Sequence, residues 1–142
     1  MSYRCQHFDI RELVSPKFYA KHGDNSWWWI DPRLCAMLDK IHDKFGTTYI
    51  NTWHWSGRFD QRGLRSQIDL AALKREGIYL PDGFHECGKA ADMHFKNVSV
   101  KEAREYILSH PIEFPDIRGV EIAPSWLHVD VRNSPNVIVF NA

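Results

Sequence analysis

The last third of the chain is strand-like, and this limits the folds that are open to it. Residues 119–122 and 127–132 are two short strand-forming runs with a hairpin-length linker between them, and 137–140 is a further apolar run. The clear helical patterns all come earlier in the chain. Because the helices precede the strands instead of alternating with them, we predict an α+β fold in which three or so helices flank an antiparallel sheet.

Capping signals place the helices of the earlier part. Asp31 and Pro32 suit the N-cap and the first position of a helix over 32–45, and Gly46 is placed to end it. Further patterns predict short helical pieces within an irregular segment 1–30, a strand over 47–53, and helices over 66–76 and 100–109.

Length and charge describe one globular domain over 1–142. Hydrophobic residues make up 44% of the 142 residues, and 18 basic residues balance 18 acidic ones. A net charge of zero disfavours a nucleic-acid partner and a polybasic membrane anchor. No apolar run approaches the roughly 20 residues of a membrane span, and the first residues lack the apolar centre of a signal peptide. We therefore expect a monomer that is made in the cytoplasm.

The numbers and spacing of cysteine, tryptophan and histidine are informative. Cys5, Cys35 and Cys87 are odd in number and widely spaced, so we expect reduced thiols and neither a disulfide framework nor a cysteine zinc site. Six tryptophans and eight histidines are an unusual excess. The three consecutive tryptophans at 27–29 cannot share one face of an element, and both a core role and a ligand-stacking role stay open for them.

Two polar segments have the composition of a metal site. His85 and Asp92 lie in HECGKAAD, and His128 lies in the strand-like WLHVDVR. Two imidazoles and one carboxylate are a typical ligand set for catalytic zinc, which keeps its fourth position for water. A spacing of seven residues would point His85 and Asp92 to opposite faces of a regular strand. We therefore expect a bend at Gly88 that brings both side chains to one Zn²⁺ ion.

The predicted hairpin adds two carboxylates near His128. If the chain turns about residues 124 and 125, residues 121 and 128 stand opposite each other and project from the same face. Glu121 then lies beside His128 as a candidate general base. Asp130, two residues further along that face, is a candidate to orient a ligand imidazole. The reverse assignment, with Asp130 as the base, stays open.

Each of these residues also has an ordinary structural explanation. A single histidine on a strand is usually a partly buried residue with satisfied hydrogen bonds, and Glu121 can be a surface charge on a hairpin. The prediction rests on the combination of HxxGxAxD with a His-x-Asp strand about 35 residues later.

Together, HECGKAAD and WLHVDVR resemble the M15 peptidases, which are zinc D-Ala-D-Ala carboxypeptidases and endopeptidases that cut bacterial cell-wall peptides. The family pattern S-x-H-x-x-G-x-A-x-D, followed by a late strand with a third ligand, makes His85, Asp92 and His128 the zinc ligands. Gly63-Leu64-Arg65-Ser66 is similar to the family's S-G-Y-R-S stretch. Arg65 then corresponds to the arginine that contacts substrate near the scissile bond, or Arg62 does so if the register differs.

The resemblance spans about residues 7–132, because His7-Phe8 and Glu12-Leu13 are similar to the family's N-terminal lead. It implies a Hedgehog/DD-peptidase-like fold and a peptidase of the short type found in bacteriophages and prophages. It also implies an endolysin-like activity on peptidoglycan stem peptides, as a carboxypeptidase or an endopeptidase. Without a signal peptide, such an enzyme would reach the cell wall by another route.

The sequence departs from the family at three positions. Gly83 stands where a serine is usual, and Ser125 and Trp126 stand where other members have a catalytic Glu or His. The assignment of the base to Glu121 therefore rests on the hairpin geometry alone. Trp53, Trp55 and Trp126 are candidates for the walls of a substrate groove, with core packing as the alternative.

Two other functions compete with the peptidase interpretation. The departures at the base position leave open a catalytically silent, zinc-stabilised phage or wall-binding module. A metal nuclease is disfavoured, because the net charge is zero and the chain has no acidic cluster suited to Mg²⁺.

Overall fold

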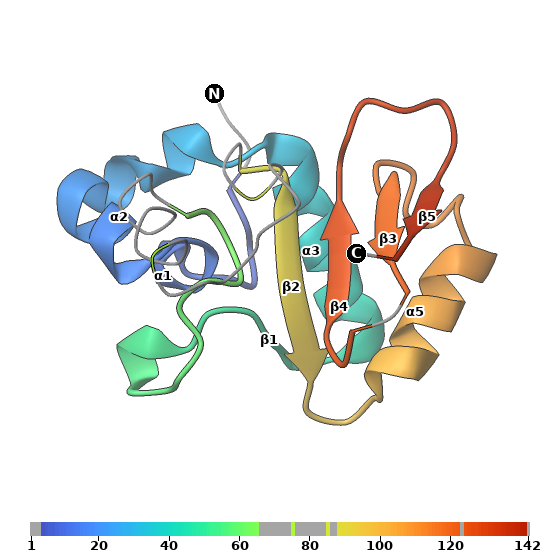
Figure 1. The fold of residues 1–142 in the computed structure, drawn as a ribbon, viewed down its shortest axis with the longest axis horizontal. Coiled ribbons are helices and arrows are strands. Elements are labelled where there is room, and N and C mark those ends of the chain that lie inside the picture. The colour runs from blue at the N-terminus through green and yellow to red at the C-terminus, as the bar shows by residue number, and fades with distance from the viewer. Residues whose placement is uncertain (1–3, 66–74, 76–84, 86–87, 123, 142) are drawn as a thin grey trace.

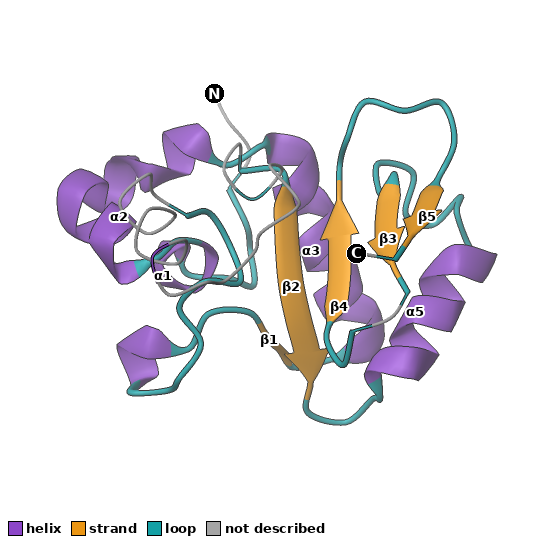
Figure 2. Cartoon of the chain, viewed as in Figure 1, coloured by secondary structure: helices purple, strands orange, loops and turns teal. Residues whose placement is uncertain are grey.

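The computed structural model describes residues 4–65, 75, 85, 88–122 and 124–141, which form an α+β fold (Figures 1 and 2). Its helices are α1 (Ile10–Leu13), α2 (Pro16–His22), α3 (Pro32–Phe45) and α5 (Val100–Ser109), with 3-10 helices η1 (Gly23–Trp29) and η2 (Trp53–Trp55). Its strands are β1 (Thr48–Tyr49), β2 (Ala90–Phe95), β3 (Gly119–Glu121), β4 (Leu127–Asp130) and β5 (Ile138–Phe140), in the spatial order β1-β2-β4-β3-β5. The predicted α+β class is confirmed.

The helices α3 and α5 begin and end where their capping residues predict. The Asp31 side chain accepts a hydrogen bond from the backbone N–H of Arg33, and Pro32 occupies the first turn of α3. Gly46 follows α3 with φ of 81°, a conformation that glycine adopts without strain. In the same way, the Ser99 hydroxyl accepts from the N–H of Glu102 at the start of α5.

The hairpin of β3 and β4 has the predicted register. These strands pair antiparallel, and Glu121 lies directly opposite His128. On its other edge β4 pairs antiparallel with β2, so that Asp92 also lies opposite His128. The strand β4 therefore lies between two partners at the centre of the sheet.

The prediction of a wholly antiparallel sheet is wrong for β5. This strand pairs parallel with β3, with Phe140 opposite Glu121. Both edges of β4 are occupied by β2 and β3, and β5 lies on the outer edge of β3. After β4 the chain passes β3 and runs antiparallel to β4, which is also the direction of β3, so β5 pairs parallel with β3.

The predicted strand over 47–53 is also too long. Only Thr48 and Tyr49 pair with β2, and the chain then leaves the sheet for η2. Asn51 Nδ2 and Trp53 Nε1 both donate to the carbonyl oxygen of Val14, at 2.9 and 3.0 Å. Hydrogen bonds to the N-terminal segment thus replace the strand ladder that the β-branched residues suggested.

The sheet has a core face and a polar face. Side chains that alternate along β2, β4 and β3 join the hydrophobic core with α3, which lies behind β2 and β4 in Figure 1; they are Ala91, Met93, Val120, Leu127 and Val129. The residues between them, which include Asp92, His128 and Glu121, project from the opposite face. Two of the three candidate metal ligands, Asp92 and His128, are therefore carried by the face that the core leaves free.

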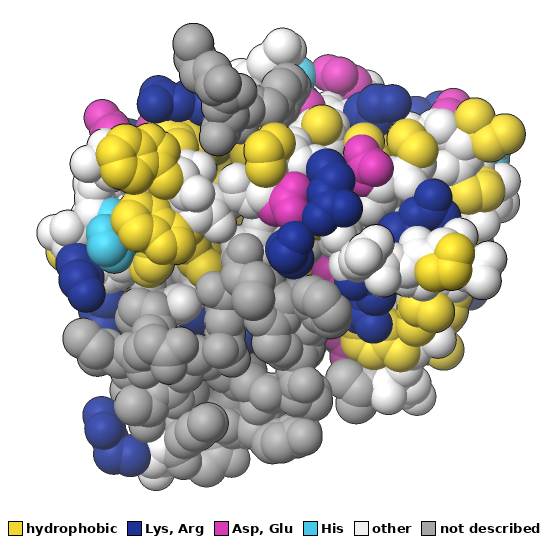
Figure 3. Space-filling view, turned by 90° about the horizontal axis from the view of Figure 1, so that it is seen from above, with side chains coloured by type: hydrophobic (Ala, Val, Ile, Leu, Met, Phe, Trp, Pro, Cys, Tyr) yellow, Lys and Arg dark blue, Asp and Glu magenta, His cyan; other side chains and the backbone are white. Residues whose placement is uncertain are grey.

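The three consecutive tryptophans pack on different neighbours, as expected. Trp27 belongs to the core, whereas Trp28 is 71% exposed and Trp29 is 43% exposed. His22 packs against Trp29, with ring centroids 4.3 Å apart. Hydrophobic side chains also gather beside a histidine on the face of the molecule seen in Figure 3.

Other sequence predictions have separate outcomes. The irregular segment 1–30 contains the expected short helices. Cys5 and Cys35 are free thiols, and Cys35 is buried. The helix predicted over 66–76 lies outside the described residues except for Arg75, and Cys87 and Gly83 lie outside them as well. Among the helices that are described, none combines the length and the apolar character needed to cross a membrane.

Glu12 gives the fold an expected pH dependence. Its side chain is buried, and burial raises the pKa of this carboxyl from 4.5 to about 7. Between these values the unfolded chain loses a proton that the folded chain keeps, so the free energy of unfolding should fall as pH rises from 4.5 to 7. Glu12→Gln keeps an acceptor for the N–H of Asp9 and should flatten this slope.

Urea unfolding at pH 5 and pH 8 measures the effect. Glu105→Gln, which removes an exposed carboxylate, should keep the wild-type slope. Equal slopes for Glu12→Gln and the wild type would contradict the prediction.

Candidate metal centre

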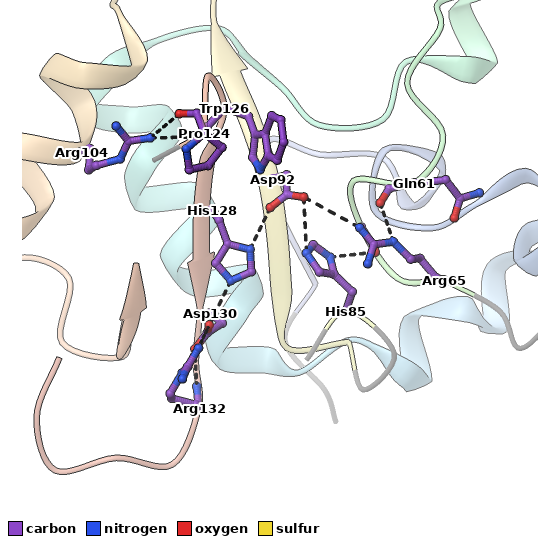
Figure 4. A network of polar contacts seen from close by, with 11 residues as sticks. Gln61, Arg65, His85, Asp92, Arg104, Pro124, Trp126, His128, Asp130 and Arg132 are labelled. Atoms are coloured by element: carbon purple, nitrogen blue, oxygen red, sulfur yellow. Dashed lines mark hydrogen bonds and ion pairs between the residues drawn. The ribbon is translucent and has the colours of Figure 1, made fainter. Parts of the chain in front are cut away.

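Three buried side chains bring potential metal-ligand atoms together. One nitrogen each from His85 and His128 and one oxygen from Asp92 all lie within 4.8 Å of one another. His85 Nε2 is 3.4 Å from Asp92 Oδ2, and His128 Nδ1 is 2.8 Å from Asp92 Oδ1 (Figure 4). The structure thus brings together all three residues that the sequence predicted as ligands.

Strand pairing places two of these side chains next to each other. Asp92 and His128 are opposite each other in the antiparallel pair of β2 and β4, and directly opposed residues project from the same face. Their neighbours in sequence, such as Met93 and Leu127, point into the core and anchor both strands there.

Gly88 provides the bend that brings His85 to Asp92. Its φ of 67° is in the left-handed region, as the odd spacing of the two ligands predicts. A Cβ atom at this position would lie 1.9 Å from the carbonyl oxygen of Trp29. The backbone of Gly88 is held there because its own carbonyl accepts from the N–H of Asp31 at 2.9 Å.

A backbone carbonyl sets the orientation of the His85 ring. Nδ1 lies 3.1 Å from the carbonyl oxygen of Gly63. Because a carbonyl only accepts, Nδ1 must carry a proton and donate, which leaves Nε2 as the nitrogen that faces Asp92. A neutral His85 with its proton on Nδ1 is the tautomer that a metal ligand requires.

A carboxylate sets the orientation of the His128 ring in the same way. Nε2 lies 3.0 Å from Asp130 Oδ2, so Nδ1 faces Asp92 and His85. Arg132 in turn binds both oxygens of Asp130, with Nε at 2.7 Å from Oδ1 and Nη2 at 2.6 Å from Oδ2. The carboxylate is thus held from two sides, in the position expected of a residue that orients a ligand.

Charge keeps both carboxylates of this network ionised. Burial by itself would raise the pKa of Asp130, but hydrogen bonds from Arg132 and His128 outweigh it and lower the pKa to about 2. Burial opposes ionisation of Asp92 as well. Attraction from His85 and a hydrogen bond from His128 nevertheless hold its pKa below the ordinary range. An ionised Asp92 is what a divalent cation needs.

The donor set could hold a metal ion. Two imidazole nitrogens and one carboxylate oxygen meet here, with separations of 3.4 and 2.8 Å from Asp92 to the two imidazoles.

Arg65 lies beside this group, whereas the side chain of Arg62 turns elsewhere. Arg65 Nη2 is 3.9 Å from Asp92 Oδ2, and its Nε donates to the Gln61 carbonyl at 2.8 Å (Figure 4). Arg62 instead places Nη1 2.6 Å from His94 Nδ1. Of the two arginines that the sequence offered, Arg65 is the one whose side chain adjoins a predicted ligand.

Glu121 extends the row of Asp92 and His128 across the sheet. It is opposite His128 on β3, as predicted, and it is partly exposed where His128 is buried. Phe140 is opposite Glu121 on β5, and its ring packs edge-on against His128 with centroids 5.5 Å apart. The pairing thus places Glu121 next to a candidate ligand and nearer to the surface.

A pocket of about 310 Å³ opens beside Asp92. The described residues that line it are Arg58, Phe59, Asp60, Gln61, Arg62, Arg65, Asp92 and Trp126. Of the three tryptophans expected at a groove, Trp126 lines this pocket, whereas Trp53 donates to a backbone carbonyl and packs near the N-terminal segment.

A second group of ligand-type side chains lies at the surface. His7, His42 and Asp43 also bring three such atoms within 4.8 Å. The rings of His7 and His42, however, stack face to face at 4.1 Å, and His7 and Asp43 are exposed, whereas all three residues of the first group are buried. The buried group is the better candidate for a metal centre.

Two supporting residues received no role from the sequence. Arg132 is two positions beyond Asp130, and this spacing could have placed it on the same face. Gly119 gave no such signal. It lies opposite Asp130 on β3, and a Cβ there would come within 2.2 Å of Asp130 Oδ1. Its lack of a side chain makes room for the carboxylate, which only the pairing of the strands reveals.

Comparisons with known proteins do not assign the chain to a family. No protein-family model, no curated protein and no solved structure matches it. What the chain does is therefore inferred from the residues of the candidate centre and from the pocket beside it.

Proposed function

We propose that this protein is a zinc-dependent peptidase that hydrolyses a peptide bond in bacterial peptidoglycan stem peptides. The observation that carries the proposal is the buried group of His85, Asp92 and His128 with an arginine-lined pocket beside it. Structural zinc sites are usually completed by four protein ligands. Among the described residues, three ligand-type groups meet here, which suits a catalytic site that keeps one position for water.

The residues around the ligands supply the remaining chemistry. Bound zinc would activate a water molecule and polarise the peptide carbonyl. Glu121 would take the proton of the attacking water and pass it to the leaving amine. Arg65 would donate to the carbonyl oxygen as negative charge develops on it. Asp130 is the weaker candidate for the base, because Arg132 and His128 already occupy its oxygens.

The resemblance of the zinc motifs to the M15 peptidases supports the same proposal, and with it a Hedgehog/DD-peptidase-like fold. We also propose that the protein is of the bacteriophage or prophage type. It would be made in the cytoplasm, and it would act at the cell wall as a monomer. Carboxypeptidase and endopeptidase activity are distinguished by the product that is released.

Digestion of purified muropeptides by the zinc-loaded protein, followed by mass spectrometry, tests the proposal. We expect one zinc ion per chain and cleavage that stops on addition of a chelator and returns with zinc. A chain that binds zinc but cleaves no muropeptide would instead be a silent, zinc-stabilised module.

Two variants separate the base from the orienting residue. Glu121→Gln should lower kcat by about 10²- to 10⁴-fold and leave zinc binding unchanged, because it removes a proton acceptor and no ligand. Asp130→Asn should weaken zinc binding by about 10- to 100-fold, because it disturbs the orientation of His128.

Zinc affinity and kcat are measured for both variants, with Glu105→Gln as the exposed-carboxylate control. Full activity in Glu121→Gln, together with a loss of kcat at saturating zinc in Asp130→Asn, would assign the base to Asp130.

A further inference from the structure

Among the described residues that line the pocket beside Asp92, arginines outnumber carboxylates. Arg58, Arg62 and Arg65 line it, against the carboxylates of Asp60 and Asp92. Asp92 is already engaged by His85 and His128. The arginines other than Arg65 have no part in the chemistry proposed above.

Arg62 is held in place by four contacts. Its N–H donates to Asn51 Oδ1 at 2.9 Å, and its carbonyl accepts from the N–H of Asp92 at 2.8 Å. Its guanidinium contacts His94 Nδ1 at 2.6 Å and lies over the ring of Phe59, 3.5 Å from the centroid. The side chain is therefore positioned in advance of any ligand, next to the backbone of a predicted metal ligand.

Arg58 brings a second guanidinium to the same aromatic ring. Its Cζ lies 4.8 Å from the centroid of Phe59. The ion pairs found among the described residues include none from Arg58 or Arg62 to a carboxylate. Two like charges around one ring are a site that an anion would stabilise.

Gln61 indicates what kind of anion fits. Its side-chain oxygen is buried and has no hydrogen-bond donor among the residues described. A peptide offers N–H donors as well as a carboxylate, whereas inorganic phosphate is chiefly an acceptor. The lining of the pocket therefore matches an acidic peptide better than a free anion.

We propose that Arg58 and Arg62 form a subsite that binds a carboxylate of the peptide substrate, next to the bond that is cut. The position of the subsite next to a cleaved bond rests on the proposed peptidase function. The binding of a carboxylate by the two arginines does not depend on it. The carboxylate comes either from the free C-terminus of the substrate or from an acidic side chain. A pair of guanidinium groups suits both sources, since either carboxylate can accept two parallel hydrogen bonds from N–H groups of an arginine.

Binding and turnover of matched peptides test the subsite. The probes are an N-acylated peptide that ends in D-Ala-D-Ala with a free C-terminus, its C-terminal amide, and an amidated peptide with an acidic side chain near the scissile bond. Dissociation constants come from calorimetry on the zinc-loaded protein, and KM and kcat come from product analysis. The variants are Arg58→Ala, Arg62→Gln and Arg62→Lys. Arg11→Ala, at a partly exposed arginine outside the described lining of the pocket, is the control.

We expect Arg58→Ala and Arg62→Gln each to weaken binding of the preferred carboxylate peptide roughly tenfold, because each removes a charged hydrogen bond. KM should rise with little change in kcat, Arg62→Lys should recover part of the loss, and Arg11→Ala should match the wild type. Arg58 is exposed, so its variant stays informative if Arg62→Gln does not fold. A preference for the free C-terminus assigns an exopeptidase substrate, and a preference for the acidic side chain assigns an internal site.

The outcomes separate this inference from the function on which it rests. Cleavage with equal KM for the acid and amide peptides in every variant would overturn the subsite and leave the peptidase intact. Arginine-dependent binding of the carboxylate peptide without cleavage would retain the subsite and reject the peptidase. Inorganic phosphate that binds as tightly as the carboxylate peptide, through the same arginines, would overturn the assignment to a peptide.

Discussion

Replacing Asp92 by asparagine is expected to abolish both tight zinc binding and peptidase activity. Asp92 is the residue that both imidazoles face, at 3.4 Å from His85 and 2.8 Å from His128. A neutral amide is a poor ligand and no longer attracts the cation. A bound metal contributes several kcal/mol to catalysis, and each ~1.4 kcal/mol corresponds to a tenfold change in rate. We therefore expect kcat/KM to fall on the order of 1,000-fold.

Zinc content by mass spectrometry, thermal unfolding and muropeptide cleavage measure the effect of Asp92→Asn. If the group is the proposed zinc site, zinc at 1,000 times its dissociation constant would add about 4 kcal/mol to the stability of the wild type. A chelator should therefore lower the wild-type Tm by roughly 10 °C and leave that of the variant unchanged. Glu102→Gln on the exposed side of α5 serves as control. Wild-type zinc affinity in Asp92→Asn would show that the group is not a metal centre.

Replacing Gly63 by alanine is expected to destabilise the fold and the candidate centre together. A Cβ at Gly63 would lie 2.2 Å from the carbonyl oxygen of Leu13. That carbonyl is fixed, because it accepts from the N–H of Leu64 at 2.7 Å. The obstacle is backbone and cannot rotate away, so the cost should be about 3 kcal/mol, at the upper end of typical overpacking.

The same substitution moves a contact of the candidate centre. The Gly63 carbonyl receives the Nδ1 proton of His85, so a shift of this backbone changes the direction of the His85 ring. We expect a Tm lower by roughly 10 °C and weaker zinc binding in the variant that still folds. Lys101→Ala, on the exposed face of α5, should change neither quantity. Wild-type values for Gly63→Ala would contradict the close approach of residues 13 and 63.

Local signals in the sequence predict those parts of the fold that local chemistry decides. The bounds of α3 and α5 follow from Asp31, Pro32 and Ser99, because a cap acts on backbone groups two or three residues away. The register of Glu121 and His128 follows from the short linker between their strands. Neither feature requires knowledge of the rest of the chain.

Features that depend on competition between distant segments were predicted wrongly or not at all. The parallel pairing of β5 depends on the chain passing β3 after β4 and joining the outer edge of β3. The early end of β1 follows from hydrogen bonds that Asn51 and Trp53 give to Val14. Residues 47–53 have the composition of a strand, and composition carries no information about a better partner elsewhere.

For the candidate centre, the sequence by itself determined which residue types are present and how they are spaced, and hence the set His85, Asp92 and His128. Only the tertiary structure decided that a carbonyl of Gly63 turns one imidazole, that Asp130 with Arg132 turns the other, and that Arg58 and Arg62 lie around Phe59 beside them. The physical reason is that ligand chemistry belongs to each side chain, whereas orientation, burial and unneutralised charge arise from segments that meet only when the chain folds.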